Sequence, residues 1–74
     1  MSNEIGILNK NEDNKFVIFI GEIKHIVLSS GTIIEVFNEV SNSWIRTRIE
    51  FNGSTNQYYG TTFQLQIGQK VRIA

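Results

Sequence analysis

Cysteine and proline are both absent from this 74-residue sequence. Without cysteine, neither disulfides nor thiolate metal sites are available to stabilise a chain of this length. Without proline, every backbone N–H is kept, so strands anywhere in the chain can pair on both sides. A domain this small buries a limited share of its surface. Its stability must therefore come from good apolar packing or from a partner subunit.

Good helix formers are also scarce. The only alanine is Ala74, and the sequence has 3 leucines against 12 isoleucines and 5 valines. β-Branched side chains lose rotamer freedom in a helix and suit the pleated surface of a sheet. The composition therefore predicts an all-β fold, and the length predicts a single small domain over residues 1–74.

The sequence has no excess charge of either sign and no long apolar run. Seven Lys and Arg balance seven Asp and Glu, so the chain lacks the basic character of a dedicated DNA-binding protein. No apolar run approaches membrane-spanning length, and the polar residues 1–4 are not followed by the apolar segment of a signal peptide. Together with the lack of cysteine, these features lead us to expect a cytoplasmic protein.

Turn-forming clusters divide the sequence into short apolar or alternating segments. These segments predict strands at residues 5–8, 16–20, 32–37, 44–51, 57–62 and 69–73. Residues 22–30 are either a short strand or an irregular loop, and residues 63–67 are a connector with a short helical turn. Many short strands separated by turns favour a closed antiparallel barrel of five to six strands, of the SH3-like kind. Closure of this sort removes exposed strand edges.

The residue types needed for catalysis are mostly missing. His25 is the only imidazole, no serine lies in a nucleophile-elbow motif, and no glycine-rich phosphate loop occurs. Glu12 and Asp13 are adjacent carboxylates, a pattern typical of a solvated turn. His25 itself is either a ligand or proton switch, or simply a half-exposed residue in an irregular segment. We therefore predict no enzymatic activity, no cofactor and no metal site.

The best candidate binding surface is the polar face of segment 44–51. Alternation directs Trp44, Arg46 and Arg48 to one side of the sheet. A hairpin with segment 57–62 would place Tyr58 beside Glu50 on that same side. Aromatic and arginine side chains occur together in protein interface hot spots and in nucleic-acid-binding surfaces. With an arginine of the last strand that extends the positive patch, the predicted binding residues are Trp44, Arg46, Arg48, Tyr58 and Arg72.

A purely structural role is the alternative for these side chains. Antiparallel pairing of segments 32–37 and 44–51 would place Glu35 near Arg46 and Phe37 near Trp44. Charge pairs and aromatic pairs across neighbouring strands are ordinary stabilising contacts in sheets. The sequence leaves both interpretations open.

Phe16–Ile20 is a run of five consecutive apolar residues. A strand in so small a domain must turn part of such a run toward its outer face. If this strand lies at an edge of the sheet, a homodimer formed through Phe16–Ile20 would cover it.

Four strand motifs follow one another along the C-terminal part of the chain: a glycine-led I-E-V strand, W-I-x-T-R-I-E, an aromatic strand and a final G-x-x-V-R-I. The residues that carry them are Gly31, Glu35, Val36, Trp44, Thr47, Arg48, Ile49, Glu50, Phe51, Tyr59, Gly68, Val71, Arg72 and Ile73. Together they resemble a family of very small bacterial proteins known only as a domain of unknown function. Its members are found mainly in low-GC Gram-positive bacteria and in their phages and integrative elements.

The resemblance carries no assigned activity and implies only a context, that of an accessory protein of a phage or mobile element. Combined with the small size and the lack of catalytic groups, it favours a non-catalytic module that binds a protein partner. The sharpest form of this hypothesis is stoichiometric inhibition of a host defence nuclease, in the manner of anti-CRISPR proteins. Two alternatives remain. One is a nucleic-acid-binding or regulatory barrel that uses Trp44, Arg46, Arg48 and Tyr58. The other is a structural accessory protein that forms homodimers.

Overall fold

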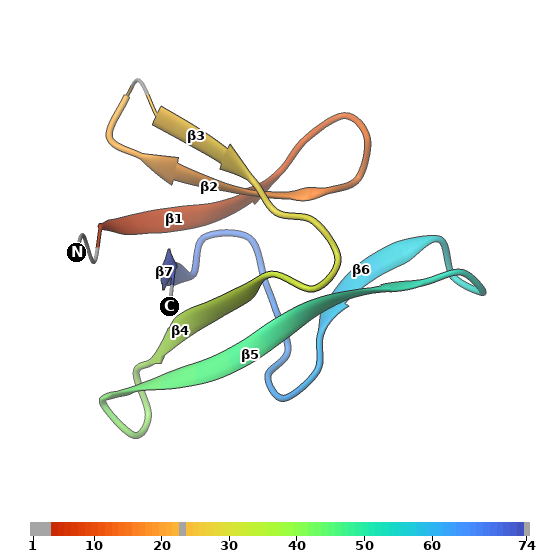
Figure 1. Ribbon diagram of the computed structural model, residues 1–74. Coiled ribbons are helices and arrows are strands. Elements are labelled where there is room, and N and C mark those ends of the chain that lie inside the picture. The colour runs from red at the N-terminus through yellow and green to blue at the C-terminus, as the bar shows by residue number, and fades with distance from the viewer. Residues whose placement is uncertain (1–3, 23, 74) are drawn as a thin grey trace.

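The computed structural model describes residues 4–22 and 24–73 of the chain, and every element in these two ranges is a strand or a turn (Figure 1). The all-β prediction is thereby confirmed. Because no helix occurs in the described ranges, none is present there that could cross a membrane. The strands are β1 (Ile5–Lys10), β2 (Phe16–Ile20), β3 (Lys24–Val27), β4 (Ile33–Asn38), β5 (Ser43–Asn52), β6 (Gln57–Gly60) and β7 (Lys70–Ile73).

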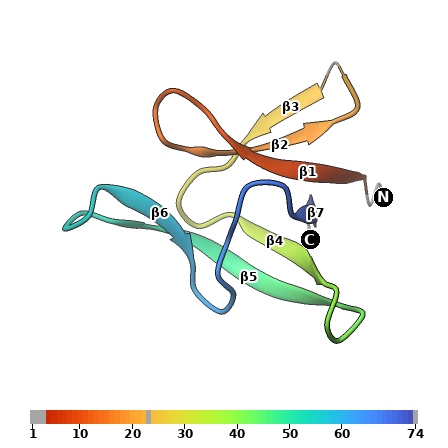
Figure 2. The ribbon, with the colours of Figure 1, turned by 180° about the vertical axis from the view of Figure 1, so that it is seen from behind.

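The sheet consists of two antiparallel meanders joined by the last strand. β1, β2 and β3 form one meander and β4, β5 and β6 form the other, so that the strand order is β3-β2-β1-β7-β4-β5-β6. β7 pairs with β1 on one side and with β4 on the other. Figures 1 and 2 show the two meanders as separate halves with the short β7 between them. The C-terminal motif therefore links segments that are far apart in the sequence.

The prediction of a closed barrel with five to six strands is wrong in two respects. The described part of the chain contains seven strands, and their pairing leaves the sheet open, with β3 and β6 at its two ends. Segment 22–30 supplies the additional strand, β3, which pairs with β2 over Lys24–Val27. The predicted helical turn at 63–67 is also absent, because this connector is irregular.

Asparagine residues make three of the tight turns. Asn14, Asn42 and Asn56 have positive φ values of 66°, 55° and 58°. Asparagine tolerates this left-handed conformation better than other residues with a side chain, and it is common in hairpin loops for that reason. Each lies just before the second strand of an antiparallel pair: β2, β5 and β6. These turns fix the register of the three pairs.

The core lies on one face of the curved sheet. Its fully buried members come from both meanders and from β7: Leu8, Phe16, Ile18, Leu28, Ile34, Val36, Ile49 and Val71. Thr47 is buried with them, and its hydroxyl accepts a hydrogen bond from the backbone N–H of Thr62 at 3.0 Å. The alternation of segment 44–51 is confirmed here, since Thr47 and Ile49 point inward while Arg46 and Arg48 are exposed.

The strand pairing does not support a homodimer through an edge at Phe16–Ile20. β2 lies between β1 and β3 and so has no free edge. Phe16, Val17 and Ile18 are buried within the chain itself. The apolar run is long because both neighbouring strands and the core contact this strand.

Candidate protein-binding face

The side of the sheet opposite the core is here called the outer face. Register and alternation assign its residues strand by strand. The assignment requires only that directly opposed residues share a face. The outer face consists of Ile5, Ile7, Asn9, Val17, Phe19, His25, Val27, Ile33, Glu35, Phe37, Trp44, Arg46, Arg48, Glu50, Asn52, Gln57, Tyr59, Lys70 and Arg72.

A row of aromatic, aliphatic and cationic side chains crosses six strands of this face. Its members, from β5 to β3, are Trp44, Phe37, Lys70, Ile7, Phe19 and His25. The Phe37 and Trp44 rings meet edge to face with centroids 5.3 Å apart, and the ammonium of Lys70 lies 5.1 Å from the Phe37 centroid. At the other end, the rings of Phe19 and His25 are stacked at 4.2 Å. The predicted placement of Phe37 beside Trp44 is confirmed.

Arg72 is held in position by two neighbours. Its Nε donates a hydrogen bond of 2.7 Å to Oε1 of Glu35, and its guanidinium lies 4.0 Å from the centroid of the Trp44 ring. A cation that lies over an aromatic ring while it donates a directed hydrogen bond suits the planar guanidinium of arginine better than the ammonium of lysine. The structure thus unites Trp44 and Arg72, as the predicted positive patch required. It also shows that one face of the Trp44 ring is occupied.

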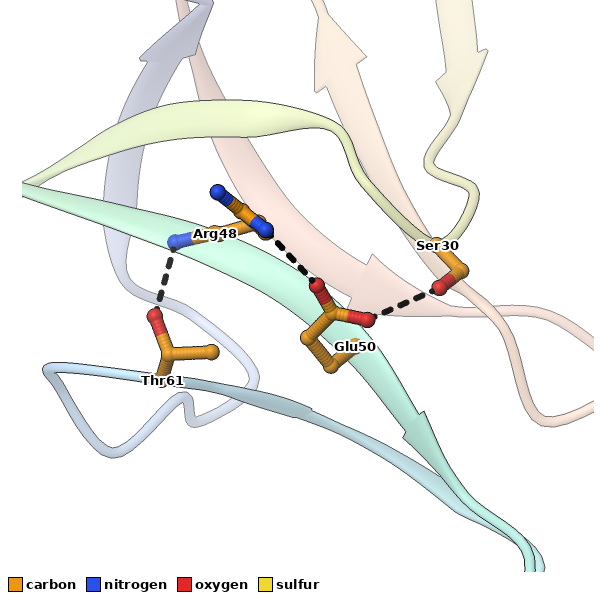
Figure 3. A network of polar contacts seen from close by, with 4 residues as sticks. All are labelled: Ser30, Arg48, Glu50 and Thr61. Atoms are coloured by element: carbon orange, nitrogen blue, oxygen red, sulfur yellow. Dashed lines mark hydrogen bonds and ion pairs between the residues drawn. The ribbon is translucent and has the colours of Figure 1, made fainter.

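Arg48 and Glu50 form a second polar group on the outer face, beside the loop that connects β3 to β4. Nη1 of Arg48 lies 3.4 Å from Oε2 of Glu50, while the Ser30 hydroxyl donates to Oε1 of the same carboxylate at 3.1 Å. The backbone N–H of Arg48 donates to Oγ1 of Thr61 at 3.3 Å (Figure 3). The Arg48 side chain is still 58% exposed. An exposed pair of this kind contributes little to stability, so the guanidinium remains available to a ligand.

Arg46 is the exposed cation of β5 with the fewest constraints. It lies opposite Glu35, as predicted from the sequence. The Glu35 carboxylate, however, accepts its hydrogen bond from Arg72. Within residues 4–22 and 24–73, Arg46 forms no ion pair. A depression of about 450 Å³ adjoins this side chain and is lined by Ile33, Arg46, Thr47, Arg48, Thr61 and Thr62.

Tyr58 does not lie on the outer face. The register of β5 and β6 pairs Glu50 with Tyr59 and Phe51 with Tyr58, so the predicted placement of Tyr58 beside Glu50 is wrong by one residue. Tyr58 instead packs against the core, and its ring contacts Phe51 with centroids 4.8 Å apart. A shift of one residue moves a side chain to the opposite face of a strand. Tyr59 therefore takes the outward position.

Charge is unevenly distributed over this neutral chain. Four cationic side chains point outward on this face, Lys70, Arg46, Arg48 and Arg72, against two carboxylates, Glu35 and Glu50. The outer face is therefore positive, and the rest of the chain carries the compensating negative charge. The net charge of zero, taken alone, concealed this asymmetry.

Residues of β1, β2 and β3 were not predicted to lie on the binding face. Ile7, Phe19 and His25 join it because β7 brings the first meander beside β4. Ile7 is 45% exposed, which is unusual for an aliphatic side chain in the middle of a sheet, and Val27, on the terminal strand β3, is 54% exposed. A signal was present in the adjacent apolar residues Ile7 and Leu8, since neighbours in a strand point to opposite faces.

Comparison with known proteins places the chain in a family. The family model described as Domain of unknown function (DUF5348) matches residues 6–73. The chain belongs to this family. The match extends beyond the C-terminal motifs to β1 and β2, so the whole sheet with both meanders corresponds to a DUF5348 domain. No curated protein and no solved structure matches the chain.

Proposed function

We propose that this DUF5348 protein is a non-catalytic module that binds another protein through the outer face of its sheet. The observation that carries the proposal is the combination, on one face, of excess positive charge and exposed aliphatic side chains. Ile7, Val27 and Ile33 are each at least 40% exposed on this face. Ile33 lies directly opposite Arg48 of β5, with Arg46 next to it on the same face, whereas Ile7 and Val27 lie on β1 and β3. Protein interfaces use arginine together with apolar residues in this way.

The arrangement favours a protein partner over a nucleic acid. Base stacking needs an open aromatic ring, but the guanidinium of Arg72 covers one face of the Trp44 ring, and Tyr58 lies on the core side. Trp44 and Tyr58, the two rings that the stacking hypothesis used, therefore do not lie together on the outer face. Arg46, Arg48 and Lys70 are the outward cations left to contact phosphates. They would give a salt slope of only about −3, far below that of a protein with many phosphate contacts.

The more specific forms of the proposal rest on different grounds. Inhibition of a host defence nuclease follows from the resemblance to proteins of phages and mobile elements, and no residue of the outer face distinguishes a nuclease from another acidic protein. A homodimer through the outer face is disfavoured because the face would bring its own excess positive charge against itself. The partner that suits the outer face is accordingly an acidic protein surface.

Site-directed photo-crosslinking in a lysate of the organism that encodes the chain tests this function. A photoreactive phenylalanine analogue replaces Arg48 on the outer face in one variant and Gln64 in the other. Gln64 is exposed in the connector before β7 and lies outside the outer face. We expect the Arg48 variant to capture a defined polypeptide that resists nuclease treatment, and the Gln64 variant to capture none of it.

The second half of the test is a charge reversal. Arg46→Glu introduced into the Arg48 crosslinking variant should abolish capture, whereas Lys15→Glu, which makes the same charge change in the turn between β1 and β2, should leave it intact. Capture of nucleic acid in place of protein would overturn the proposal. Equal capture by the Arg48 and Gln64 variants would do the same.

A further inference from the structure

β6 covers only part of β5. Its four residues pair with Ile49–Asn52, while the preceding residues of β5 extend beyond it. In Figure 1 this first half of β5 has β4 along one side and no strand along the other. β5 thus has a free edge at residues 43–46, in addition to the free edges of the terminal strands β3 and β6.

The direction of the backbone groups along this edge follows from the bonds already made. The N–H of Ile49 donates to Thr32 O, on the β4 side. Arg48 O accepts from the N–H of Thr61, on the β6 side. Because backbone groups alternate along a strand, the even-numbered residues Trp44 and Arg46 direct their N–H and C=O groups toward the free edge.

The described part of the chain satisfies only one of these backbone groups. After β6, the hydroxyl of Thr62 donates to Arg46 O at 2.6 Å, and the connector then leaves the strand. Within the described ranges, the N–H of Arg46 and both backbone groups of Trp44 have no hydrogen-bond partner in the protein. A backbone left open beside a folded sheet can pair with an additional strand.

We propose that the free edge of β5 at residues 43–46 accepts an extended segment of an acidic protein partner by strand addition. This inference rests on the proposed function and names how the partner binds. Backbone hydrogen bonds to Trp44 and Arg46 supply the pairing, and side chains at alternate positions supply the specificity. A strand added along residues 43–46 would pair with four residues of β5, as many as β6 pairs with at Ile49–Asn52.

The positive charge of Arg46 indicates which kind of segment fits the free edge of β5. A residue opposite Arg46 in the added strand shares its face, and a carboxylate there forms the ion pair that Arg46 lacks within the described part of the chain. The residue two positions away reaches either Trp44 or the depression bounded by Arg48 and Ile33. The segment is therefore expected to carry acidic residues at alternate positions.

A second copy of this chain fits the edge less well. Antiparallel self-pairing of residues 43–46 would place Arg46 of both copies on the same face of one continuous sheet, close to the dyad, with Arg48 of each copy farther along the strand. Like charges on neighbouring strands are destabilising. The open edge is thus suited to an acidic strand of another protein.

Selection of short random peptides against the full chain tests the inference, with amide hydrogen exchange of the isotopically labelled protein as the structural readout. We expect the selected peptides to be enriched in Asp or Glu at alternate positions. We expect their binding to slow exchange at the N–H groups of Trp44 and Arg46. Arg46→Glu should weaken binding by about tenfold or more, through loss of one ion pair and gain of a repulsion, while Lys15→Glu should leave it unchanged.

The alternative outcomes are distinguishable. If bound peptides perturb outer-face residues such as Ile33 but leave the Trp44 and Arg46 amides in rapid exchange, strand addition is wrong and the proposed function stands. If no acidic preference emerges, or no peptide is selected, strand addition of an acidic segment is overturned. If those amides are already protected in the free protein and its mass is that of two chains, a second copy occupies the edge and the inference fails.

Discussion

Two adjacent residues of β5, Arg48 and Ile49, should respond to truncation in opposite ways. Ile49 is completely buried in the core, whereas the Arg48 side chain is 58% exposed and, within the described ranges, pairs only with Glu50. Ile49→Ala should cost about 2–5 kcal/mol, from lost burial and from the cavity that remains. Arg48→Ala should cost at most about 1 kcal/mol, the contribution of an exposed ion pair.

The size of the domain makes the first of these effects large. At about 0.05–0.15 kcal/mol per residue, a chain of 74 residues has a free energy of unfolding of about 4–11 kcal/mol. Ile49→Ala therefore removes a major part of the stability. With a urea dependence of about 1 kcal/mol per molar for a small domain, a loss of about 3 kcal/mol lowers the unfolding midpoint by about 3 M, or unfolds the protein in buffer.

Urea titration followed by far-UV circular dichroism measures both effects. Ile49→Val is the matched control and should cost about 0.5–1.5 kcal/mol, because it removes one methylene and keeps most of the packing. The reasoning would be refuted if Arg48→Ala unfolded the protein, since Arg48 would then be a structural residue and unavailable for binding. A loss below about 1 kcal/mol for Ile49→Ala would equally contradict the assignment of the core.

Two further predictions concern other contacts of the sheet. A Cβ on Gly6 would lie 2.6 Å from the carbonyl oxygen of Phe19, whereas a Cβ on Gly53 would have no atom within 4 Å. Gly6→Ala should therefore lower the free energy of unfolding by about 1–3 kcal/mol or more, measured by thermal unfolding. Gly53→Ala, the control, should be close to neutral. Arg72→Lys keeps the charge beside Glu35 but loses the guanidinium that lies over the Trp44 ring. It should cost about 0.5–1 kcal/mol and shift the indole N–H resonance, and an unchanged resonance would count against this cation–π contact.

Pairings within a hairpin were the part of the structure that the sequence predicted best. The strands at 32–37 and 44–51 are close in sequence, and their alternation placed Glu35 opposite Arg46 and Phe37 opposite Trp44, as observed. The next hairpin was predicted one residue out of register. Its loop, residues 53–56, ends on Asn56 with a φ of 58°, and nothing in the composition of that loop distinguishes this turn from one a residue shorter.

Pairings between distant segments could not be predicted in this way. β7 lies between β1 and β4, and no local pattern near residues 70–73 indicates which strands will be its neighbours. Two consequences for the binding face followed. Arg72 is engaged by Glu35 and Trp44 although the sequence suggested a free cation. Ile7 and Phe19 joined a surface that the sequence confined to β5, β6 and the last strand.

The open sheet could not be predicted for the same reason, because closure also depends on how segments distant in the sequence pair. The sequence predicted closure because closure protects strand edges, but β3 and β6 remain at the two ends of the strand order. Closure depends on strand number, tilt and stagger taken together, which no single segment reveals. The unpaired edge of β5 therefore became visible only in the structure.

Amide hydrogen exchange of the free protein is the most direct test of the central claim, that β5 presents an open edge beside a cationic face. The N–H groups of Ile45 and Thr47 point toward β4 and pair with it, whereas those of Trp44 and Arg46 point to the free edge. Slow exchange at Ile45 and Thr47 with rapid exchange at Trp44 and Arg46 is the predicted result. Protection of all four amides in the monomeric protein would show that another part of the chain covers the edge, and would contradict the account.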